Sequence, residues 1–249
     1  MATQQHKKFK ILLVGDTCTD LYSYGTINRL SPEAPVPVFL PDRMDSKPGM
    51  ASNVYENLKA LGCSVTAIYG QKSEKCRLID SKSGQQIVRI DNDVFSDVID
   101  LEKIDYNIPY DAIVISDYEK GFLDYVSIIE LRKRFTQPIF IDTKKKDLHH
   151  FNGCFVKINE DEYNNAVSLC DDLIVTLGDK GAKLYDTIYP TKKVEILDVC
   201  GCGDTFLSAL TYKYLDTQSI GEAITFANKA SSVTVQHRGV YAPKLKEIL

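Results

Sequence analysis

The sequence predicts an α/β protein in which a mostly parallel sheet is covered by helices on both faces, with a small β-sheet beside it. Short apolar runs of the kind that form strands buried on both faces recur along the chain, and helical patterns lie between many of them. With 249 residues, 44% of them hydrophobic, the chain is long enough for one such domain spanning residues 1–249. The expected strands are Ile11–Val14, Val65–Tyr69, Ala112–Ile115, Ile139–Ile141, Cys154–Ile158 and Leu173–Leu177.

Three segments have the pattern of helices that pack against such a sheet. Asn53–Leu61 places its apolar residues on one face, and Gly62 then favours the end of that helix. Thr205–Tyr214 is an apolar helix that follows a glycine-containing loop. Ser219 begins a Ser-x-x-Glu capping box, which predicts the start of a long helix that continues to about Val235.

Polar residues follow four of the six expected strands and close a fifth. Because ligands bind outside the carboxyl ends of the strands in open parallel sheets, such residues indicate one shared cleft. Strands also end in turn-forming residues for purely structural reasons, so a single residue of this kind would carry no weight. The residues in question are Asp16, Asp117, Asp142, Asn159 and Thr176.

Two segments do not fit the alternation of strands and helices. Tyr22–Phe39 contains a proline-rich stretch, Ser31–Val38, and proline is excluded from a central strand or a helix interior. Gln85–Asp91 alternates two kinds of residue, which suits a strand with two distinct faces. We expect these two segments to form the small β-sheet outside the main layer and to act as a lid over the cleft.

The last third of the chain contains a glycine loop, Asp198–Phe206, that leads directly into the apolar helix. Gly201 and Gly203 allow a tight turn that presents backbone N–H groups, and the helix adds its positive dipole end, so the loop is a candidate anion site. Asp204 lies at the same place. A carboxylate beside a phosphate site suits a base that takes a proton from an attacking hydroxyl; the alternative is that Asp204 caps the helix.

Composition and charge exclude several classes of partner. The net charge of −4 and the pI of about 5.6 give no broad basic surface, so we expect no nucleic-acid partner. No apolar run approaches the length of a membrane span, and Met1–Lys10 is polar and lacks the apolar core of a signal peptide. The seven cysteines are scattered without metal-ligand spacing. We therefore expect free thiols, no membrane partner and a cytoplasmic location.

Together, these motifs resemble those of the ribokinase-type carbohydrate kinases, often called the PfkB family. The late motif is Asp198–Phe206, and Pro48–Asn53 is similar to the family's early glycine motif. The resemblance extends over most of the chain, from about Lys10 to Gly239, with the motifs in family order. It implies a three-layer ribokinase-like fold, phosphoryl transfer from ATP with Mg²⁺, and a homodimer that forms through the lid. It leaves open whether a monovalent cation is also needed.

Three further segments resemble a narrower group, the kinase half of the bifunctional heptose 7-phosphate kinase/adenylyltransferases. These segments are Val14–Asp20, Arg29–Val38 and Ser116–Gly121. Enzymes of that group phosphorylate the anomeric hydroxyl of D-glycero-D-manno-heptose 7-phosphate, on the route to lipopolysaccharide heptose. Because the sequence has no His-x-Gly-His element, we expect the adenylyltransferase half to be absent.

The sequence also departs from the family pattern. Met50 stands where the early motif usually has glycine, and Cys202 where the late motif usually has alanine. Asp142–Lys144 replaces the usual Asp-Pro-Lys, and Lys157–Asn159 replaces Thr-Pro-Asn. Between Gly70 and Lys75, about half a dozen residues bridge a region where the family normally carries a further helix and strand. We therefore expect an altered sugar-side rim and lid.

The resemblance assigns chemistry to Asp204 and to the loop before it. Asp204 matches the catalytic base, which would deprotonate the sugar hydroxyl as that oxygen attacks the γ-phosphate. The N–H groups of Gly201, Cys202, Gly203 and Asp204 would stabilise charge on the phosphoryl group. Lys120 is either a contact to the sugar's own phosphate or a solvated lysine. The family positions that hold sugar hydroxyls are matched by Asp16, Asp20, Gly49 and Asn53, the last of which also suits a helix N-cap.

Other matched positions lie where the family binds the nucleotide. Asn159 and Glu162 form an Asn-x-x-Glu capping box, which is a complete structural explanation. The family nevertheless places this pair near the phosphates, with the glutamate reaching Mg²⁺ through water. Lys144 resembles a phosphate-contacting lysine. The remaining nucleotide-side positions are Thr176, Gly178, Gly181 and, beside the adenine, Asn228.

The leading interpretation is an ATP-dependent sugar kinase that acts on heptose 7-phosphate. The alternatives are a kinase for another sugar or sugar phosphate, and a pseudokinase that serves as a binding partner. The intact base and glycine loop argue against the pseudokinase. A nicotinamide dehydrogenase is disfavoured because Gly15 opens no Gly-x-Gly-x-x-Gly run after the first strand.

Overall fold

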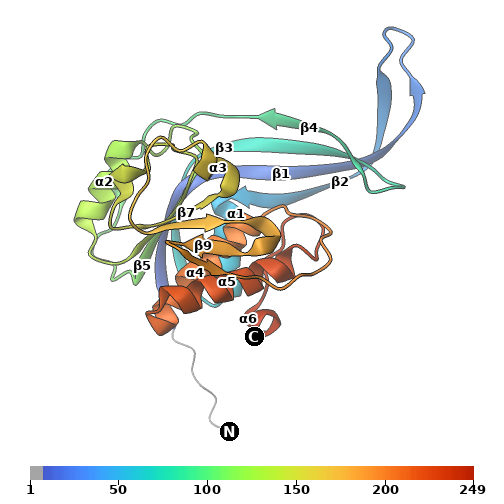
Figure 1. Ribbon diagram of the computed structural model, residues 1–249. Helices are drawn as coiled ribbons and strands as arrows, with labels where there is room; N and C mark the ends of the chain where they lie inside the picture. The colour runs from blue at the N-terminus through green and yellow to red at the C-terminus, as the bar shows by residue number, and fades with distance from the viewer. Residues whose placement is uncertain (1–7) are drawn as a thin grey trace.

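The computed structural model describes residues 8–249, which form one ten-stranded sheet with helices on both faces (Figure 1). Residues 1–7, part of the polar N-terminal segment considered above, lie outside the described residues. The strands are β1 (Lys10–Leu30), β2 (Pro37–Met50), β3 (Ser64–Asp80), β4 (Gln86–Asn92), β5 (Ala112–Asp117), β6 (Ile139–Thr143), β7 (Phe155–Asn159), β8 (Leu173–Thr176), β9 (Ala182–Leu184) and β10 (Thr187–Tyr189). The α-helices are α1 (Ala51–Ala60), α2 (Tyr125–Arg134), α3 (Glu160–Asn164), α4 (Cys202–Thr217), α5 (Ile220–Thr234) and α6 (Leu245–Ile248), and the 3₁₀ turns are η1 (Leu101–Lys103), η2 (Leu148–Phe151) and η3 (Gly178–Lys180).

The sheet is parallel at its centre and antiparallel at its edges. Its strands follow the order β10-β9-β8-β7-β6-β5-β1-β3-β4, and β2 pairs with β1 outside this path. Pairing is parallel from β8 to β3, whereas β2, β4, β9 and β10 pair antiparallel. All six expected strands lie in the parallel part, so the α/β class and the mostly parallel sheet are confirmed.

Two hydrophobic cores lie on opposite faces of the sheet, and β1 contributes to both. Ile11 and Leu13 belong to the core under α1, α4 and α5, whereas Leu12 and Val14 belong to the core under α2. The central strands are therefore buried on both faces, which is why they read as continuous apolar runs. In the part of the chain that is described, no helix is both long enough and apolar enough to span a bilayer.

The outer parts of four strands leave the helical layers and form a long arm, here defined as residues 20–47 and 75–92 (Figure 1). Both expected lid segments lie in it. Tyr22–Phe39 covers the outer end of β1 and the turn into β2, and Gln85–Asp91 corresponds to β4. The arm is not the separate small sheet that the sequence suggested, because β1 and β3 pair from the core to the arm with a single register shift between Gly15 and Thr17.

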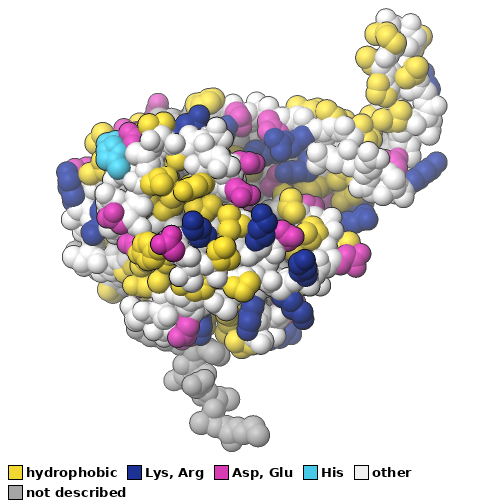
Figure 2. Space-filling view, viewed as in Figure 1, with side chains coloured by type: hydrophobic (Ala, Val, Ile, Leu, Met, Phe, Trp, Pro, Cys, Tyr) yellow, Lys and Arg dark blue, Asp and Glu magenta, His cyan; other side chains and the backbone are white. Residues whose placement is uncertain are grey.

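The proline-rich part of the arm is consistent with its place in the sheet. Pro37, Pro41 and Pro48 all lie in β2, which pairs only with β1, and an edge strand tolerates residues without an N–H donor. Hydrophobic side chains gather towards the outer end of the arm (Figure 2). The exposed large hydrophobic residues of the whole arm are Leu30, Val36, Leu40, Met44, Ile87, Val88 and Ile90.

The short segment between Gly70 and Lys75 is part of one uninterrupted strand. β3 pairs with β1 on both sides of it, from Lys10 opposite Ser64 to Gly25 opposite Asp80. The chain therefore passes straight from the main sheet into the arm without an intervening helix. This brings Arg77 of β3 next to Asp20 of β1, a contact that the sequence did not predict.

Candidate active site

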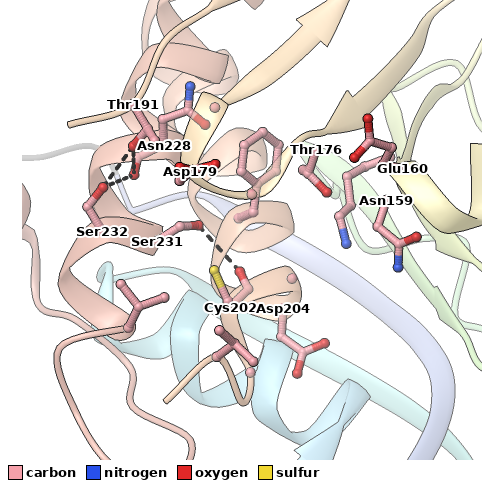
Figure 3. Close-up of a pocket in the computed structure, with 18 of the residues that line it drawn as sticks. Asn159, Glu160, Thr176, Asp179, Thr191, Cys202, Asp204, Asn228, Ser231 and Ser232 are labelled. Carbon is pink, nitrogen blue, oxygen red and sulfur yellow. Dashed lines mark hydrogen bonds between the residues drawn. The ribbon is translucent and has the colours of Figure 1, made fainter. Parts of the chain in front are cut away.

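A cavity of about 690 Å³ lies between the carboxyl ends of β6–β8 and the first turn of α4 (Figure 3). It is the place where ligands are expected in an open parallel sheet. The expected nucleotide-side and loop residues that line it are Lys144, Asn159, Thr176, Gly178, Gly181, Gly201, Cys202, Gly203, Asp204 and Asn228. The expected residues that do not line it are Asp16, Asp20, Gly49, Asn53, Lys120 and Glu162.

The glycine loop forms one wall of the cavity. Gly201 is the N-cap of α4 with φ 75°, and a Cβ there would come within 2.6 Å of Asn53 Nδ2, so both conformation and space require glycine. A Cβ on Gly203 would lie 2.8 Å from Lys157 Nζ. The Cys202 N–H donates to Val199 O at 3.2 Å, which removes one of the four expected donors. The N–H groups of Gly203 and Asp204 remain in the first helical turn, where the helix itself offers no acceptor.

Asp204 is buried at this wall and is held at both carboxylate oxygens. Asn53 Nδ2 donates to Oδ2 at 2.8 Å, and the Tyr118 hydroxyl donates to Oδ1 at 3.0 Å. The carboxylate makes no N-cap bond, since Gly201 holds that position without a side-chain cap. Burial, together with the charge of Asp142, raises the pKa of Asp204 to about 6. A carboxyl group with a pKa near the working pH is suited to take up a proton during catalysis.

A buried ion pair that the sequence analysis missed lies next to this carboxylate. Lys157 Nζ is 2.8 Å from Asp142 Oδ2, and both side chains are 5% exposed or less. Burial lowers the pKa of Lys157, but the Asp142 carboxylate outweighs it and raises that pKa above its usual value. The second oxygen of Asp142 has no partner among the described residues. The ammonium group therefore stays charged against the glycine loop.

The expected sugar-side residues do not line the cavity, but Asn53 contacts Asp204 directly and Asp16 is connected to it through Tyr118. Asp16 Oδ2 accepts from the N–H of Tyr118 at 2.7 Å and from that of Lys120 at 3.2 Å. Asp20 forms an ion pair with Arg77, and a Cβ on Gly49 would lie 2.2 Å from Asp20 Oδ2, so a side chain there would displace the Asp20 carboxylate.

The structure also shows the partner of Lys120 and the backbone conformation of Met50. The Lys120 ammonium group is paired with Asp93, which the sequence reasoning did not foresee. Met50, which replaces a glycine, adopts φ 55°, a conformation that favours glycine.

The nucleotide-side residues are held by local contacts. Asn159 and Glu162 form the reciprocal capping box, with each backbone N–H donating to the other side chain at 2.8 Å. The other Glu162 oxygen pairs with Lys144. Asn228 Nδ2 donates to Tyr189 O at 2.8 Å, and this amide lies at the end of the cavity away from Asp204 (Figure 3).

The fold is shared with solved carbohydrate kinases. Ribokinase from Thermotoga maritima has a TM-score of 0.73 and 18% identity, covering 96% of this chain and 98% of its own. Phosphofructokinase-2 from Escherichia coli has a TM-score of 0.66 and 16% identity, covering 97% of both chains. Since these identities are low, the likeness establishes the fold. The fold is accordingly ribokinase-like, as expected from the sequence.

Comparisons of the sequence with known families and proteins agree with this fold. Residues 155–247 match the family described as pfkB family carbohydrate kinase. "Bifunctional protein HldE" of a Nitratiruptor species is 30% identical over 97% of this chain and 64% of its own length. "Bifunctional protein HldE" of Proteus mirabilis is 29% identical over 93% of this chain and 61% of its own. These matches confirm the resemblance of this chain to the pfkB family of carbohydrate kinases. The chain spans about three-fifths of the length of these curated relatives.

Proposed function

We propose that this protein transfers the γ-phosphoryl group of ATP to the anomeric hydroxyl of D-glycero-D-manno-heptose 7-phosphate. The observation that carries the proposal is the buried Asp204 carboxylate at the junction of the cavity and the cluster of expected sugar-side residues. The relatives named HldE support the choice of sugar, as does the sequence around Arg29–Val38 and Ser116–Gly121. A kinase for another sugar phosphate is the alternative, because the Arg77–Asp20 pair alters the sugar side.

In this proposal each group at the glycine loop has one task. Asp204 accepts the proton of the sugar hydroxyl as that oxygen attacks in line. The N–H groups of Gly203 and Asp204 and the Lys157 ammonium group face negative charge that builds up on the phosphoryl oxygens. A site of this kind works by positioning and electrostatics rather than by covalent chemistry.

The cavity is compatible with ATP and with a magnesium ion held indirectly. Its size falls in the usual range for small-molecule sites, and its far end offers the polar groups of Thr191, Asn228 and Ser232. Both Glu162 oxygens already accept from protein groups, which suits a contact to Mg²⁺ through water and not direct ligation. A magnesium ion bound with ATP would neutralise charge on the phosphates.

Assembly and location belong to the same proposal. We propose a homodimer that forms through the arm, whose apolar side chains are exposed (Figure 2). We also propose a cytoplasmic enzyme, because all seven cysteines are free thiols.

A panel of sugars and sugar phosphates, assayed for ADP release, tests the proposal. We expect heptose 7-phosphate to give the highest kcat/KM, and NMR of the product to place the new phosphate on the anomeric oxygen. Equal or better turnover of ribose, fructose or fructose 6-phosphate would exclude the heptose assignment while leaving a sugar kinase. No turnover of any compound, with ATP still bound, would favour the pseudokinase.

A further inference from the structure

The base carboxylate is held by donors from two different parts of the fold. Asn53 lies on α1, and Tyr118 directly follows β5; they donate to opposite oxygens of Asp204, at 2.8 and 3.0 Å. A carboxylate bound at both oxygens has its plane fixed before any substrate arrives. A proton acceptor is efficient only when it is oriented toward the reacting hydroxyl.

We propose that Tyr118 is a positioning residue, whose hydroxyl acts with the Asn53 amide to orient the Asp204 carboxylate toward the sugar hydroxyl. The role rests on the proposed kinase activity and deepens it. Tyr118 was named in the sequence analysis only as part of the segment Ser116–Gly121, so its contact with Asp204, 86 residues away, is a finding of the structure.

Tyr118 is itself firmly placed. Its backbone N–H donates to Asp16 Oδ2 at 2.7 Å. Its ring lies close to two ammonium groups, with Lys75 Nζ 5.5 Å and Lys144 Nζ 5.2 Å from the ring centroid, both within cation–π range. Lys75 comes from the arm and Lys144 from the cavity. The tyrosine therefore stands between the sugar side and the nucleotide side, with its hydroxyl directed at the base.

The Tyr118 hydroxyl has a measurable effect on the pKa of Asp204. Burial and the Asp204 charge raise the pKa of Tyr118 well above its ordinary value, so the hydroxyl remains the donor. Burial raises the pKa of Asp204, whereas the Asn53 and Tyr118 donors lower it by stabilising the carboxylate. Removal of the Tyr118 hydroxyl should therefore raise the pKa of Asp204 further. The charged and titratable groups that face Asp204 are Asp142, Lys157, Tyr118, Cys18 and Cys202.

The test is the Tyr118→Phe variant, with Tyr125→Phe as its matched control. Tyr125 is a half-buried tyrosine that lies outside the cavity. Its ring stacks on Phe151, and its hydroxyl accepts a hydrogen bond from the Asp147 N–H. We expect Tyr118→Phe to lower kcat by roughly ten- to a hundredfold, with KM for ATP little changed, because only the orientation of the base is lost. The control should keep the wild-type kcat. A Tyr118→Phe enzyme with equal or higher kcat would overturn the inference.

The pH profile separates positioning from a merely structural role. The base must be ionised, so kcat/KM rises with pH through the pKa of Asp204. In Tyr118→Phe that rise should move to higher pH by roughly one pH unit, since a hydrogen bond to a charged group is lost. A profile that stays in place, with only the melting temperature lowered, would show a structural role and refute the proposal.

A readout without substrate keeps the inference separate from the proposed function. In protein labelled with ¹³C-aspartate, the Asp204 carboxyl signal, assigned by its loss in Asp204→Asn, can be titrated in wild type and in Tyr118→Phe. We expect a higher midpoint in Tyr118→Phe, and an unchanged midpoint would overturn the inference whatever the activity. If wild type phosphorylates no sugar while the midpoint shifts, the proposed function fails, but the hydrogen bond from Tyr118 to the Asp204 carboxylate is supported.

Discussion

At the scale of single residues, three buried charged side chains determine the electrostatics of the site. Asp142, Lys157 and Asp204 are each less than 5% exposed, and they meet where the glycine loop enters α4. A buried charge is tolerated only when it is paired or hydrogen-bonded. Here the lysine and one aspartate pair, which leaves Asp204 to be stabilised by the neutral donors Asn53 and Tyr118.

The Lys157–Asp142 pair should be costly to break. Lys157→Met leaves a buried carboxylate without its counter-charge, and we expect a loss of about 3–5 kcal/mol in the free energy of unfolding. The double variant Lys157→Met/Asp142→Asn should recover much of that stability but not turnover, because it lacks the cation that we propose faces the phosphoryl group. Urea unfolding and ADP release measure the two effects.

An exposed pair provides the control. Lys213 and Asp216 form an ion pair on the surface of α4, and Lys213→Met should change stability by less than about 1 kcal/mol. A loss in Lys157→Met no larger than that in Lys213→Met would contradict the account of a buried, structurally required cation.

At the scale of elements, the turn before β9 shapes the wall of the cavity. Gly181 has φ 96°, and a Cβ there would lie 2.1 Å from Tyr189 O and 2.8 Å from Thr191 N. Both contacts are to the backbone, so β10 and the segment after it must move to admit any side chain. Because Thr191 lines the cavity, a change in this turn should be felt at the nucleotide end.

Gly181→Ala should accordingly lower both stability and affinity for ATP. We expect a loss of about 2–4 kcal/mol in the free energy of unfolding, from the strained conformation plus the clash, and a higher KM for ATP. Gly62→Ala is the control: Gly62 has φ 90° but no atom within 4 Å of the added Cβ, so only about 1–2 kcal/mol should be lost. Equal losses in the two variants would contradict the proposed close packing at Gly181.

The central strands could be predicted from the sequence, and the outer ones only in part. Strands buried on both faces appear as apolar runs, and this pattern correctly located the six parallel strands, of which β6–β8 border the cavity. β9 and β10, of three residues each, are too short to stand out. The length of β1 and β3 was missed because polar residues interrupt the apolar pattern after Val14 and Tyr69, although the backbone pairing continues.

The parts of the candidate site that belong to local sequence motifs could be predicted, whereas the contacts between residues far apart in the sequence could not. The glycine loop and the strand-end residues are local patterns, so they could be read directly. Lys157 sits inside an apolar run, and nothing nearby reveals that its partner is Asp142 on the neighbouring strand. The Tyr118–Asp204 and Arg77–Asp20 contacts join residues 86 and 57 positions apart, so only the folded chain reveals them.

At the scale of the whole molecule, the feature that matters most is the arm, because its apolar side chains are exposed. It extends beyond the helical layers (Figure 1), and Val88 and Ile90 of the edge strand β4 are 43% and 55% exposed. Exposed apolar surface on a protruding edge is a liability unless another surface covers it. This is the physical reason to expect that two arms pack together.

We therefore expect a dimer at micromolar concentration by light scattering. Val88→Lys/Ile90→Lys should give a folded monomer, because two charges on the edge strand oppose pairing. Val126→Lys, at a 65% exposed position on α2, should leave the dimer intact. A monomeric wild type, or a dimer that survives the arm substitutions, would contradict assembly through the arm.

The charge on Asp204 has a cost that the neutral variant Asp204→Asn should relieve. Because burial raises the folded pKa to about 6, above the ordinary 3.8, the folded state binds more protons between these values, and stability falls as pH rises through this window. At pH 8 the Asn variant should therefore be at least as stable as wild type by urea unfolding. Any loss of activity in it then cannot be ascribed to unfolding.

The measurement that tests the central claim most directly is ADP release by Asp204→Asn, with ATP binding followed by calorimetry. Asn keeps the size of the side chain but cannot accept the proton of the attacking hydroxyl. We expect kcat to fall by about 10²–10⁴, with the ATP affinity and the fold retained. Turnover near that of wild type would contradict the account, because the buried carboxylate would then have no part in phosphoryl transfer.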